Sequence, residues 1–296
     1  CTEVTSEDDS DVCNLGSINM GRIDNLAEFS DIVELATKFL LCGTLRAKLP
    51  YDKVYRTREK NRRLGLGLMG LHDILHKKNI IIDSKEAVDF SDKLFEFYSM
   101  HAIYASSILA AERGKYETYE GSLWSGGVFP IDSYNNLMVY RGKQKVPQQS
   151  VTGKPLTGTG QTFKNWSKVR VHVGEHGMRN SNVMAIAPTA TIGYINGIEQ
   201  SIEPNFSVLF VYENKSGNFF ITNAHFIDDM KSRGLWNSEI ASLVKEADGD
   251  LSLLNGSIPE DLKEKYKTAF DRDMFTLIDA NAARQKWMDQ SISFNL

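Results

Sequence analysis

The 296-residue sequence predicts an α/β fold. Two long stretches, residues 25–49 and 83–113, have apolar residues at helical spacing. The short apolar run at residues 183–187 is typical of a buried strand, and residues 206–212 and 217–222 have the pattern of two strands joined by a turn. Hydrophobic residues make up 42% and charged residues 24% of the chain, which is the balance of a globular protein. The net charge of -4 gives no basic footprint for nucleic acid.

The three cysteines, Cys1, Cys13 and Cys42, are too few for a disulfide scaffold of this length and predict a reducing compartment. Glu3 follows Cys1 by two residues, so in an extended segment both side chains point to the same side. A thiol beside a carboxylate can transfer a hydrogen atom or a proton around one substrate carbon. A frayed chain end is the alternative interpretation. Cys42 falls on the apolar pattern of residues 25–49, so we expect a buried core thiol there.

Three glycines, Gly65, Gly67 and Gly70, have the spacing G-x-G-x-x-G. A dinucleotide-binding fold needs a strand before such glycines, a full helix after them and an acidic residue about 20 positions further on. Here only residues 71–78 remain for the helix, and Asp83 arrives too early. We therefore expect the glycines to let a strand pack closely against a neighbouring element. The interpretation of the chain as an NAD-dependent dehydrogenase would be supported by these three glycines alone.

Residues 83–113 form the clearest helix of the sequence. We expect Asp83 to be its N-cap with Glu86 as the capping-box partner, and Gly114 to be its C-cap. One face of this helix collects the apolar side chains Ala87, Phe90, Leu94, Tyr98, Ala102, Ala105 and Leu109. The pattern indicates a core helix and no further role.

Residues 116–162 are rich in Gly, Ser, Gln and Pro, which predicts a long surface excursion rather than a linker between two folds. After it, His172 and His176 stand four residues apart on an expected helix, a spacing that could ligate a metal. No third ligand stands nearby in a recognisable pattern. We therefore expect a solvated helix face and no metal site.

The stretch at residues 187–204 follows the buried strand and could open a helix. Its first part consists of small and hydroxyl residues, Pro188, Thr189, Ala190, Thr191 and Ile192. Such residues between a strand and a helix leave N–H groups exposed at the helix N-terminus, where a phosphate or another anion can bind. Threonines that cap the helix in an ordinary turn explain the same residues. The residues alone leave both interpretations open.

The last third of the chain is expected to be largely helical. Residues 223–233 form a helix that stops at Gly234, and residues 259–287 are mostly helical. The apolar alternation at residues 289–296 is typical of a strand.

Eight segments occur together, in this order, in the large catalytic subunit of ribonucleotide reductase, which the sequence resembles over nearly its whole length. They are residues 1–3, 12–19, 61–65, 177–181, 187–192, 202–204, 234–237 and 289–296. Three segments, residues 234–236, 255–258 and 289–291, are more similar to class I enzymes than to the cobalamin-dependent class. Class I enzymes pair with a separate radical-generating subunit.

The resemblance implies a ten-stranded α/β barrel made of two five-stranded halves, with a central finger loop. This chain would be the second half of the barrel, with the finger loop and its following strand at residues 1–20. The allosteric region would lie upstream, and the radical-relay tyrosines and the C-terminal reducing cysteines downstream. The chain on its own is therefore expected to be inactive.

The resemblance also implies roles for single residues. Cys1 aligns with the thiyl-radical cysteine that removes the substrate's 3′-hydrogen, and Glu3 with the carboxylate that takes the 3′-hydroxyl proton. Cys13 aligns with one member of the cysteine pair that reduces the 2′ position and becomes a disulfide. Its partner comes from the first half of the barrel. The loop from Pro188 to Ile192 aligns with the loop whose N–H groups hold the substrate diphosphate.

The partners implied in this way are a ribonucleoside diphosphate substrate, a metal-containing small subunit that supplies the radical, and a second large subunit in a homodimer. The remaining segments of the large subunit are also required. Thioredoxin or glutaredoxin would be the external reductant, and no cofactor is expected to bind the chain directly. The expected setting is the cytoplasm, with no nucleic acid and no membrane as partners. A non-catalytic relative that keeps only the phosphate loop is the alternative function.

The sequence departs from the family pattern at two places. The asparagine that stands two positions before the radical cysteine is missing, because the chain begins at Cys1. Gly193 and Tyr194 stand where serine is common after the phosphate loop, which puts the contacts there in doubt. Both chain ends look cut. Since an intein requires Cys, Ser or Thr after its splice junction, an extein segment of an interrupted gene is one expectation, and a split gene or an arbitrary cut is the other.

Overall fold

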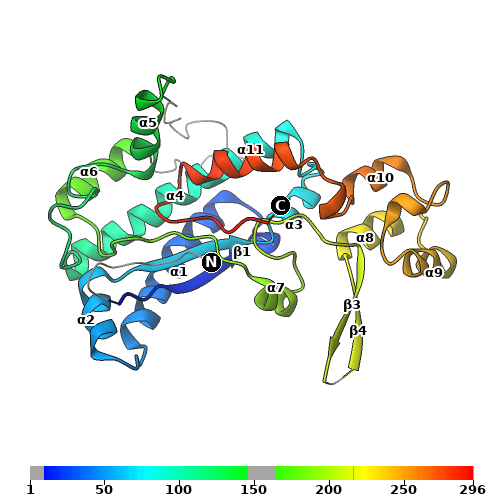
Figure 1. The fold of residues 1–296 in the computed structure, drawn as a ribbon, viewed down its shortest axis with the longest axis horizontal. Helices are drawn as coiled ribbons and strands as arrows, with labels where there is room; N and C mark the ends of the chain where they lie inside the picture. The colour runs from blue at the N-terminus through cyan, green and yellow to red at the C-terminus, as the bar shows by residue number, and fades with distance from the viewer. Residues whose placement is uncertain (1–9, 146–164, 216, 296) are drawn as a thin grey trace.

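The computed structural model describes residues 10–145, 165–215 and 217–295. The strands in those ranges are β1 (Asn14–Asn19), β2 (Leu64–Met69), β3 (Leu209–Asn214) and β4 (Gly217–Thr222). The helices there are α1 (Leu26–Arg46), α2 (Asp52–Asn61), α3 (Leu71–Lys77), α4 (Lys85–Arg113), α5 (Pro130–Tyr140), α6 (Trp166–His176), α7 (Ala190–Asn196), α8 (Ala224–Ser232), α9 (Ser238–Glu246), α10 (Glu260–Lys265) and α11 (Met274–Gln285). Short 3-10 turns are η1 (Met20–Arg22), η2 (Leu251–Leu253) and η3 (Ala269–Asp271). The fold is mixed α/β and mostly helical (Figure 1).

Four chain segments run parallel beneath the long helices. β1 and β2 pair in parallel along their whole length. Leu66 of β2 then forms a parallel bridge with Met184, and Ile186 forms one with Ile292. The order is therefore β1, β2, residues 183–187 and the C-terminal segment. Parallel neighbours need long crossover connections, and the helices between these segments provide them.

The family resemblance implies a five-stranded half-barrel, whereas the described residues show two paired strands and two further segments joined by single bridges. The buried run at residues 183–187 lies in the array as expected, although each of its ladders is only one bridge long. The strand expected at residues 289–296 is reduced to the bridge at Ile292. The expected finger loop falls largely on residues 1–9, which lie outside the described residues.

Helices cover one face of the array and form the main core with it. Leu66 and Leu68 of β2 pack in one buried cluster with side chains of α1, α4, α6 and α11. α4 also donates a hydrogen bond from the Tyr98 hydroxyl to the Leu66 carbonyl, at 2.6 Å. The apolar face expected for this helix is buried along its length. α4 is therefore the central core helix that its periodicity predicts.

The start of α4 differs from the expectation. Its N-cap is Ser84, whose side chain accepts a hydrogen bond from the Ala87 N–H. Asp83 is instead engaged by a distant part of the chain, because its carboxylate accepts hydrogen bonds from the Arg272 guanidinium and the Asp273 N–H, both at 2.9 Å. The expected C-cap, Gly114, is confirmed.

Cys42 is exposed, so the prediction of a buried thiol there was wrong. Helix α1 does run through this region as expected, and its buried positions near the C-terminal end are Leu41 and Thr44. Consecutive helical residues point about 100° apart, so the residue that follows Leu41 leaves the buried face.

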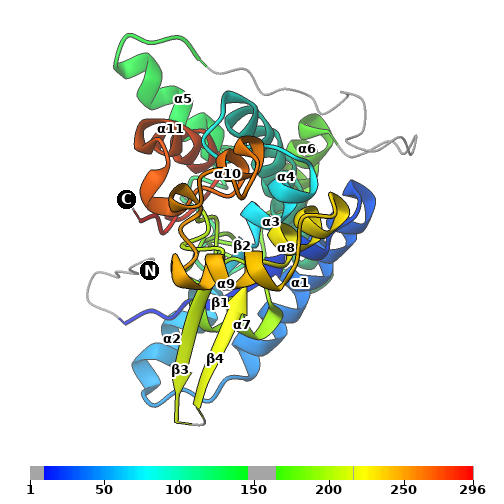
Figure 2. The ribbon, with the colours of Figure 1, turned by 90° about the vertical axis from the view of Figure 1, so that its right-hand side faces the viewer.

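A second, smaller core lies around α8, α9 and α10. Its buried members are Val208, Phe226, Met230, Val244, Leu251, Leu254, Ile258, Leu262 and Tyr266. The helix expected at residues 223–233 is α8, which begins after Asn223; the Asn223 side chain caps it by accepting a hydrogen bond from the Phe226 N–H. β3 and β4 form the expected antiparallel hairpin beside this core, although β3 begins at Leu209 rather than at residue 206. Figures 1 and 2 both show the hairpin standing away from the body of the molecule.

The described part of the expected surface excursion, residues 116–145, packs partly into the main core. Tyr116, Trp124 and Phe129 are buried there, and α5 follows them. Residues 146–164, which hold three of its seven glycines and two of its three prolines, lie outside the described residues.

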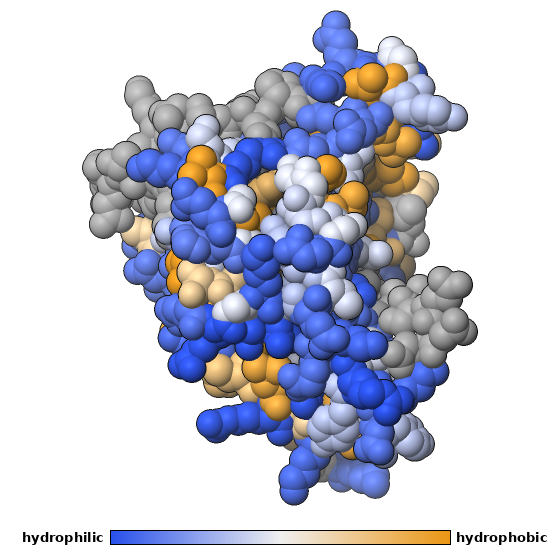
Figure 3. Space-filling view, turned by 90° about the vertical axis from the view of Figure 1, so that its left-hand side faces the viewer, coloured by the Kyte–Doolittle hydropathy of each residue, from blue (hydrophilic) through white to orange (hydrophobic). Residues whose placement is uncertain are grey.

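The molecular surface is mainly hydrophilic on the face drawn in Figure 3, where hydrophobic residues stand in small separate groups. Among the described helices, none combines the length and the hydrophobicity that crossing a membrane requires.

Candidate functional site

One face of the parallel array carries four small residues, Ser17, Gly65, Gly67 and Ala185, which we call the small-residue face; the Leu15 side chain of β1 lies on the same side, over Gly65. A Cβ atom added to Gly67 would lie 2.6 Å from the Ala185 carbonyl oxygen and 3.2 Å from the Ser17 hydroxyl. One added to Gly65 would overlap the Leu15 side chain and lie 3.3 Å from the Ala185 Cβ. Because alternate strand residues point to opposite faces, this face is turned away from Leu64, Leu66 and Leu68.

The prediction of close strand packing at these glycines is thereby confirmed. β2 leads into α3, which has only seven residues, and Gly70 at its start is in the left-handed region with φ of 72°. The segment is thus a tightly packed strand with a short helix. It does not have the long phosphate-binding helix of a dinucleotide fold.

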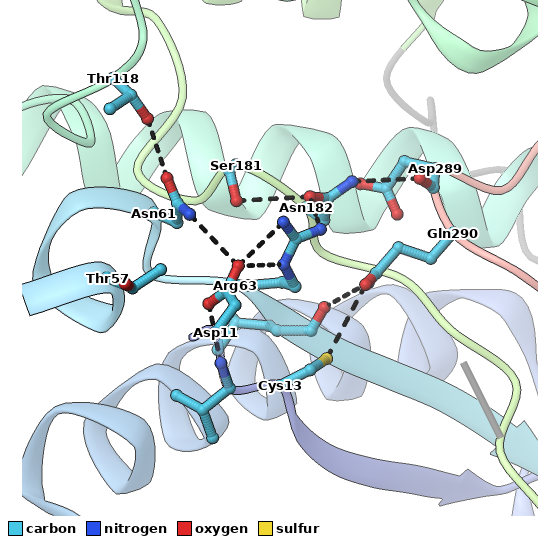
Figure 4. A network of polar contacts seen from close by, with 12 residues as sticks. Asp11, Cys13, Thr57, Asn61, Arg63, Thr118, Ser181, Asn182, Asp289 and Gln290 are labelled. Atoms are coloured by element: carbon cyan, nitrogen blue, oxygen red, sulfur yellow. Dashed lines mark hydrogen bonds and ion pairs between the residues drawn. The ribbon is translucent and has the colours of Figure 1, made fainter. Parts of the chain in front are cut away.

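Cys13 lies at the edge of the small-residue face. Its Sγ would be 3.0 Å from a Cβ added to Gly65, and it lies 3.8 Å from the Oε1 atom of Gln290 (Figure 4). Burial raises the pKa of the Cys13 thiol to about 11, opposed by the positive charge of Arg63 and reinforced by Asp289 and Asp11. The thiol therefore keeps its proton at neutral pH.

A set of polar side chains surrounds the thiol (Figure 4). Arg63 contacts the Asp11 carboxylate through Nε and Nη2, both at 3.0 Å, and donates from Nη1 to the Asn182 side-chain oxygen at 2.5 Å. Asn61 also donates to Asp11, at 3.2 Å. The Arg63 charge is therefore shared with a buried carboxylate, and the two chain segments on either side of β2 are tied together.

Asp289 fixes the C-terminal segment against the array. Its carboxylate accepts hydrogen bonds from the N–H groups of Val183 at 2.7 Å and Met184 at 2.9 Å. Its backbone carbonyl accepts one from the Asn182 side chain at 3.1 Å. Burial raises the pKa of Asp289 to about 7, while the two N–H donors oppose that shift. The neighbouring Gln290 is consequently held in place beside Cys13.

The expected phosphate loop lies at the opposite, C-terminal end of residues 183–187. Thr189 occupies the N-cap position of α7, but no side chain caps that helix. The Thr189 hydroxyl instead accepts a hydrogen bond from the Ser201 N–H at 2.7 Å, inside the protein. Pro188, Ala190, Thr191 and Ile192 are exposed. The interpretation in which threonines cap the helix is therefore wrong for Thr189, because its hydroxyl is used elsewhere.

A cavity of about 280 Å³ lies at the other end of α7. Asp73, Glu199 and His225 line it together with aromatic side chains. His225 Nε2 is 3.2 Å from the Asp73 carboxylate, which also accepts the Glu199 N–H at 2.8 Å. Burial, and then the charge of Asp73, raise the pKa of Glu199 to about 8. Sequence reasoning missed this group because its members come from three separate elements and share no motif.

The predicted site residues are only partly brought together. Cys1 and Glu3 fall on residues 1–9, outside the described residues. Cys13 lies at the N-terminal ends of the parallel segments, and the loop from Pro188 to Ile192 lies at their C-terminal ends. Sequence reasoning also missed the roles of Asp289 and Gln290. The segment that contains them matched the family, and this was the only available signal.

No group of three or more histidine, cysteine, aspartate or glutamate side chains in the described ranges is arranged to hold a metal ion. The spacing of His172 and His176 is helical, as expected. His172 Nδ1 lies 2.8 Å from the Ser107 hydroxyl of α4, so this histidine contacts the core rather than only solvent.

Comparison with known proteins gives a consistent result. The whole sequence, residues 1–296, matches the family described as ribonucleotide reductase, barrel domain. It is 40% identical over 304 residues to the ribonucleoside-diphosphate reductase subunit alpha of Chlamydia pneumoniae. It is 32% identical over 305 residues to the large subunit of the same enzyme from Caenorhabditis elegans, and 32% identical over 304 residues to that of vaccinia virus.

These alignments cover 100% of this chain but only 28% of the Chlamydia pneumoniae subunit and 36% of each of the other two. The chain thus spans about a third of the length of the relatives that it matches. The match runs over every segment that builds the parallel array and its polar surroundings. The chain belongs to the ribonucleotide reductase barrel-domain family and corresponds to part of the large subunit.

Proposed function

We propose that the chain is the catalytic part of a ribonucleoside-diphosphate reductase large subunit and reduces ribonucleoside diphosphates to deoxyribonucleoside diphosphates by thiyl-radical chemistry. The observation that supports this most directly is the position of Cys13. Its protonated thiol lies at the edge of the small-residue face, beside Gly65 of β2 and next to the Leu15 side chain of β1.

In the proposed reaction Cys1 is the radical thiol that removes the 3′-hydrogen, and Glu3 takes the 3′-hydroxyl proton. Cys13 and a second thiol, from the first half of the barrel, then reduce the 2′ position. Overall, the 2′-hydroxyl leaves as water, the carbon gains a hydrogen, and the two thiols become one disulfide. The two electrons come from the thiols, so the step balances. Thioredoxin or glutaredoxin would return the disulfide to thiols.

The loop from Pro188 to Ile192 is proposed to hold the substrate diphosphate. Two features support this. No side chain caps the first N–H groups of α7, and Thr189 is turned inward to Ser201 so that it does not compete for them. Free N–H groups at a helix start favour an anion.

The proposed enzyme also needs a metal-containing small subunit as the source of the radical, a second large subunit, and the segments of the large subunit that lie outside this chain. The proposed setting is the cytoplasm, since thiols at Cys1 and Cys13 must be kept reduced between turnovers.

The test is deoxyribonucleotide formation by the assembled enzyme, with this chain in its large-subunit context and the small subunit present. We expect Cys13→Ser and Cys1→Ser each to lower the rate by at least about a thousandfold, because a hydroxyl can neither reduce the substrate nor hold the radical. Cys42→Ser, at an exposed position of α1, is the matched control and should leave the rate unchanged.

Full activity of Cys1→Ser would show that the radical assignment is wrong. Full activity of Cys13→Ser would remove Cys13 from the reducing pair. Tight binding of a nucleoside diphosphate with no turnover in the unmodified assembly would identify a non-catalytic relative instead.

A further inference from the structure

We infer that Gln290 is a positioning residue for Cys13: its side-chain amide keeps the thiol protonated and fixes the direction of its S–H bond. The inference deepens the proposed function and rests on it, since it concerns the same reducing thiol. Gln290 comes from the C-terminal segment, 277 residues away from Cys13 in the sequence.

The amide of Gln290 can be oriented in only one way. Its Nε2 atom donates to two backbone carbonyls, that of Leu64 at 2.7 Å and that of Met184 at 3.2 Å. Both amide hydrogens are thereby used. Turning the group over would place its oxygen against two carbonyl oxygens, which repel it. Oε1 is therefore the atom that faces the Cys13 sulfur, at 3.8 Å (Figure 4).

An acceptor that cannot become a donor favours one protonation state of its partner. The thiol of Cys13 can donate its S–H to Oε1, whereas a thiolate there would meet the negative end of the amide dipole. Burial acts in the same direction, since it raises the pKa of Cys13, as do the charges of Asp289 and Asp11. The positive charge of Arg63, which is paired with Asp11, opposes this shift. The thiol is thus held as a proton carrier rather than as an exposed nucleophile.

Gln290 is itself fixed by neighbours on both sides. The Asp289 carboxylate binds the N–H groups of Val183 and Met184, so the residue before Gln290 cannot shift along the array. The Gln285 side chain donates to the Gln290 carbonyl at 2.9 Å and accepts from the Ile292 N–H at 3.1 Å. The amide therefore reaches Cys13 from a rigid frame, which is the requirement for a group that sets the direction of another.

This arrangement suits the proposed reduction. Each thiol of the pair gives up its hydrogen, so a thiol that keeps its proton until the 2′-hydroxyl leaves supplies that proton at the point of reaction. The fixed S–H direction limits the sulfur to a few geometries against the small-residue face. A group that only packed against Cys13 would give neither effect.

The test measures the reactivity of Cys13 directly. In the purified protein, iodoacetamide alkylation of Cys13 and Cys42 is followed by mass spectrometry between about pH 9 and 12, with the exposed Cys42 as the internal reference. We expect Gln290→Met, which keeps the length of the side chain, to lower the pH midpoint of Cys13 alkylation by about half a unit. Below the midpoint this shift makes alkylation about threefold faster.

Gln290→Glu is expected to act in the opposite direction. It keeps an oxygen near the sulfur and adds a negative charge, so the Cys13 midpoint should rise and alkylation should slow. A loosening of the structure would speed alkylation in both variants, so opposite signs distinguish the electrostatic role from a packing role.

Gln285→Met is the matched control, because it removes hydrogen bonds from the same segment without touching Cys13. We expect it to lower the Cys13 midpoint by less than Gln290→Met does, because the Gln290 amide keeps its own bonds to the Leu64 and Met184 carbonyls. An equal shift in Gln285→Met and Gln290→Met, or no shift in Gln290→Met, would overturn the inference.

Failure of the inference and failure of the proposed function can be told apart. If Cys13→Ser abolishes deoxyribonucleotide formation while Gln290→Met leaves the alkylation midpoint unchanged, the function stands and Gln290 has no positioning role. If Gln290→Met and Gln290→Glu shift the midpoint as expected while Cys13→Ser remains active, Gln290 controls a thiol that the reaction does not use.

Discussion

His72 and His76 lie one turn apart on α3 and are buried with few hydrogen bonds. His72 Nδ1 accepts the Asn205 N–H at 3.0 Å. Within the part of the chain that the structure describes, His72 Nε2 and both ring nitrogens of His76 have no partner. The two rings are 3.9 Å apart, and the His76 ring stacks on Tyr266 at 4.6 Å. They act as flat packing groups.

Both histidines are held neutral. Burial is the main cause that lowers the pKa of each well below its ordinary value, and the other histidines, Arg272 and Lys265 add to it. In the unfolded chain they titrate near pH 6.5. The unfolded state therefore binds more protons below that pH, and the folded state loses stability as the pH falls.

We predict that His76→Phe removes part of this acid sensitivity, because phenylalanine can stack on Tyr266 and does not titrate. The free energy of unfolding of the variant, relative to that of the unmodified protein, should rise by about 1 kcal/mol for each pH unit below 6.5. Urea unfolding at pH 7.5 and 5.5 measures the difference. His176→Phe, at an exposed end of α6, is the control and should show no such trend. A parallel change in all three proteins would contradict the prediction.

At the scale of secondary structure, β2 and the turn that follows it require glycine at two positions, for two different physical reasons. Gly70 adopts a positive φ at the turn into α3, which side chains other than glycine rarely tolerate. Gly67 has an ordinary conformation and is limited by space, since the neighbouring chain at Ala185 stands where a Cβ would be. The close approach of the two segments is thus set by the missing side chain.

We predict that Gly67→Ala destabilises the fold by about 1–3 kcal/mol, because the added methyl forces the 183–187 segment away from β2. Gly43→Ala is the matched control. Gly43 lies near the C-terminal end of α1 with no atom within 4 Å of an added Cβ, so the substitution should stabilise by about 0.5–1 kcal/mol. Thermal unfolding of both variants gives the comparison. Equal effects of the two substitutions would show that backbone entropy, and not lack of space, determines the stability change at Gly67.

At the scale of the whole molecule, the second core is joined to the main core by a buried ion pair. Arg272 is fully enclosed and contacts the Asp83 carboxylate at 2.9 Å, at the start of α4. It also donates to the carbonyls of Glu264 at 3.0 Å and Lys265 at 2.8 Å, at the end of α10. One side chain therefore satisfies groups from two separate cores.

We predict that Arg272→Met costs about 3–5 kcal/mol, because it leaves a nearly buried carboxylate and two carbonyls without their donor. Amide hydrogen exchange should become faster in α10 well before it does in α4, since α10 loses its link while α4 keeps its own core. Arg233→Met removes the exposed pair with Asp261 and should change neither exchange pattern. Uniform acceleration throughout the chain would mean that the two cores unfold as one unit.

Much of this architecture is determined locally and could be predicted. The buried face of α4, the caps at Asn223 and Gly114, and the hairpin turn before Gly217 follow from side-chain periodicity and capping chemistry within a few residues. The errors came where distant segments compete for one side chain. Asp83 was expected to cap α4, but Arg272, 189 residues away, binds it instead.

The candidate site likewise has features that the sequence predicts and features that only the tertiary structure sets. The chain's residue types determined that a thiol, a carboxylate and a helix-start loop were available, and family resemblance assigned them roles. The environment of Cys13 is a different matter, because Gln290, Asp289 and Arg63 reach it from segments that only the parallel array brings together. The sequence by itself determined the long helices α1 and α4, the close packing at the glycines of β2 and the presence of the thiol. Tertiary structure decided the protonation and direction of that thiol, since burial and hydrogen-bond geometry depend on neighbours far along the chain.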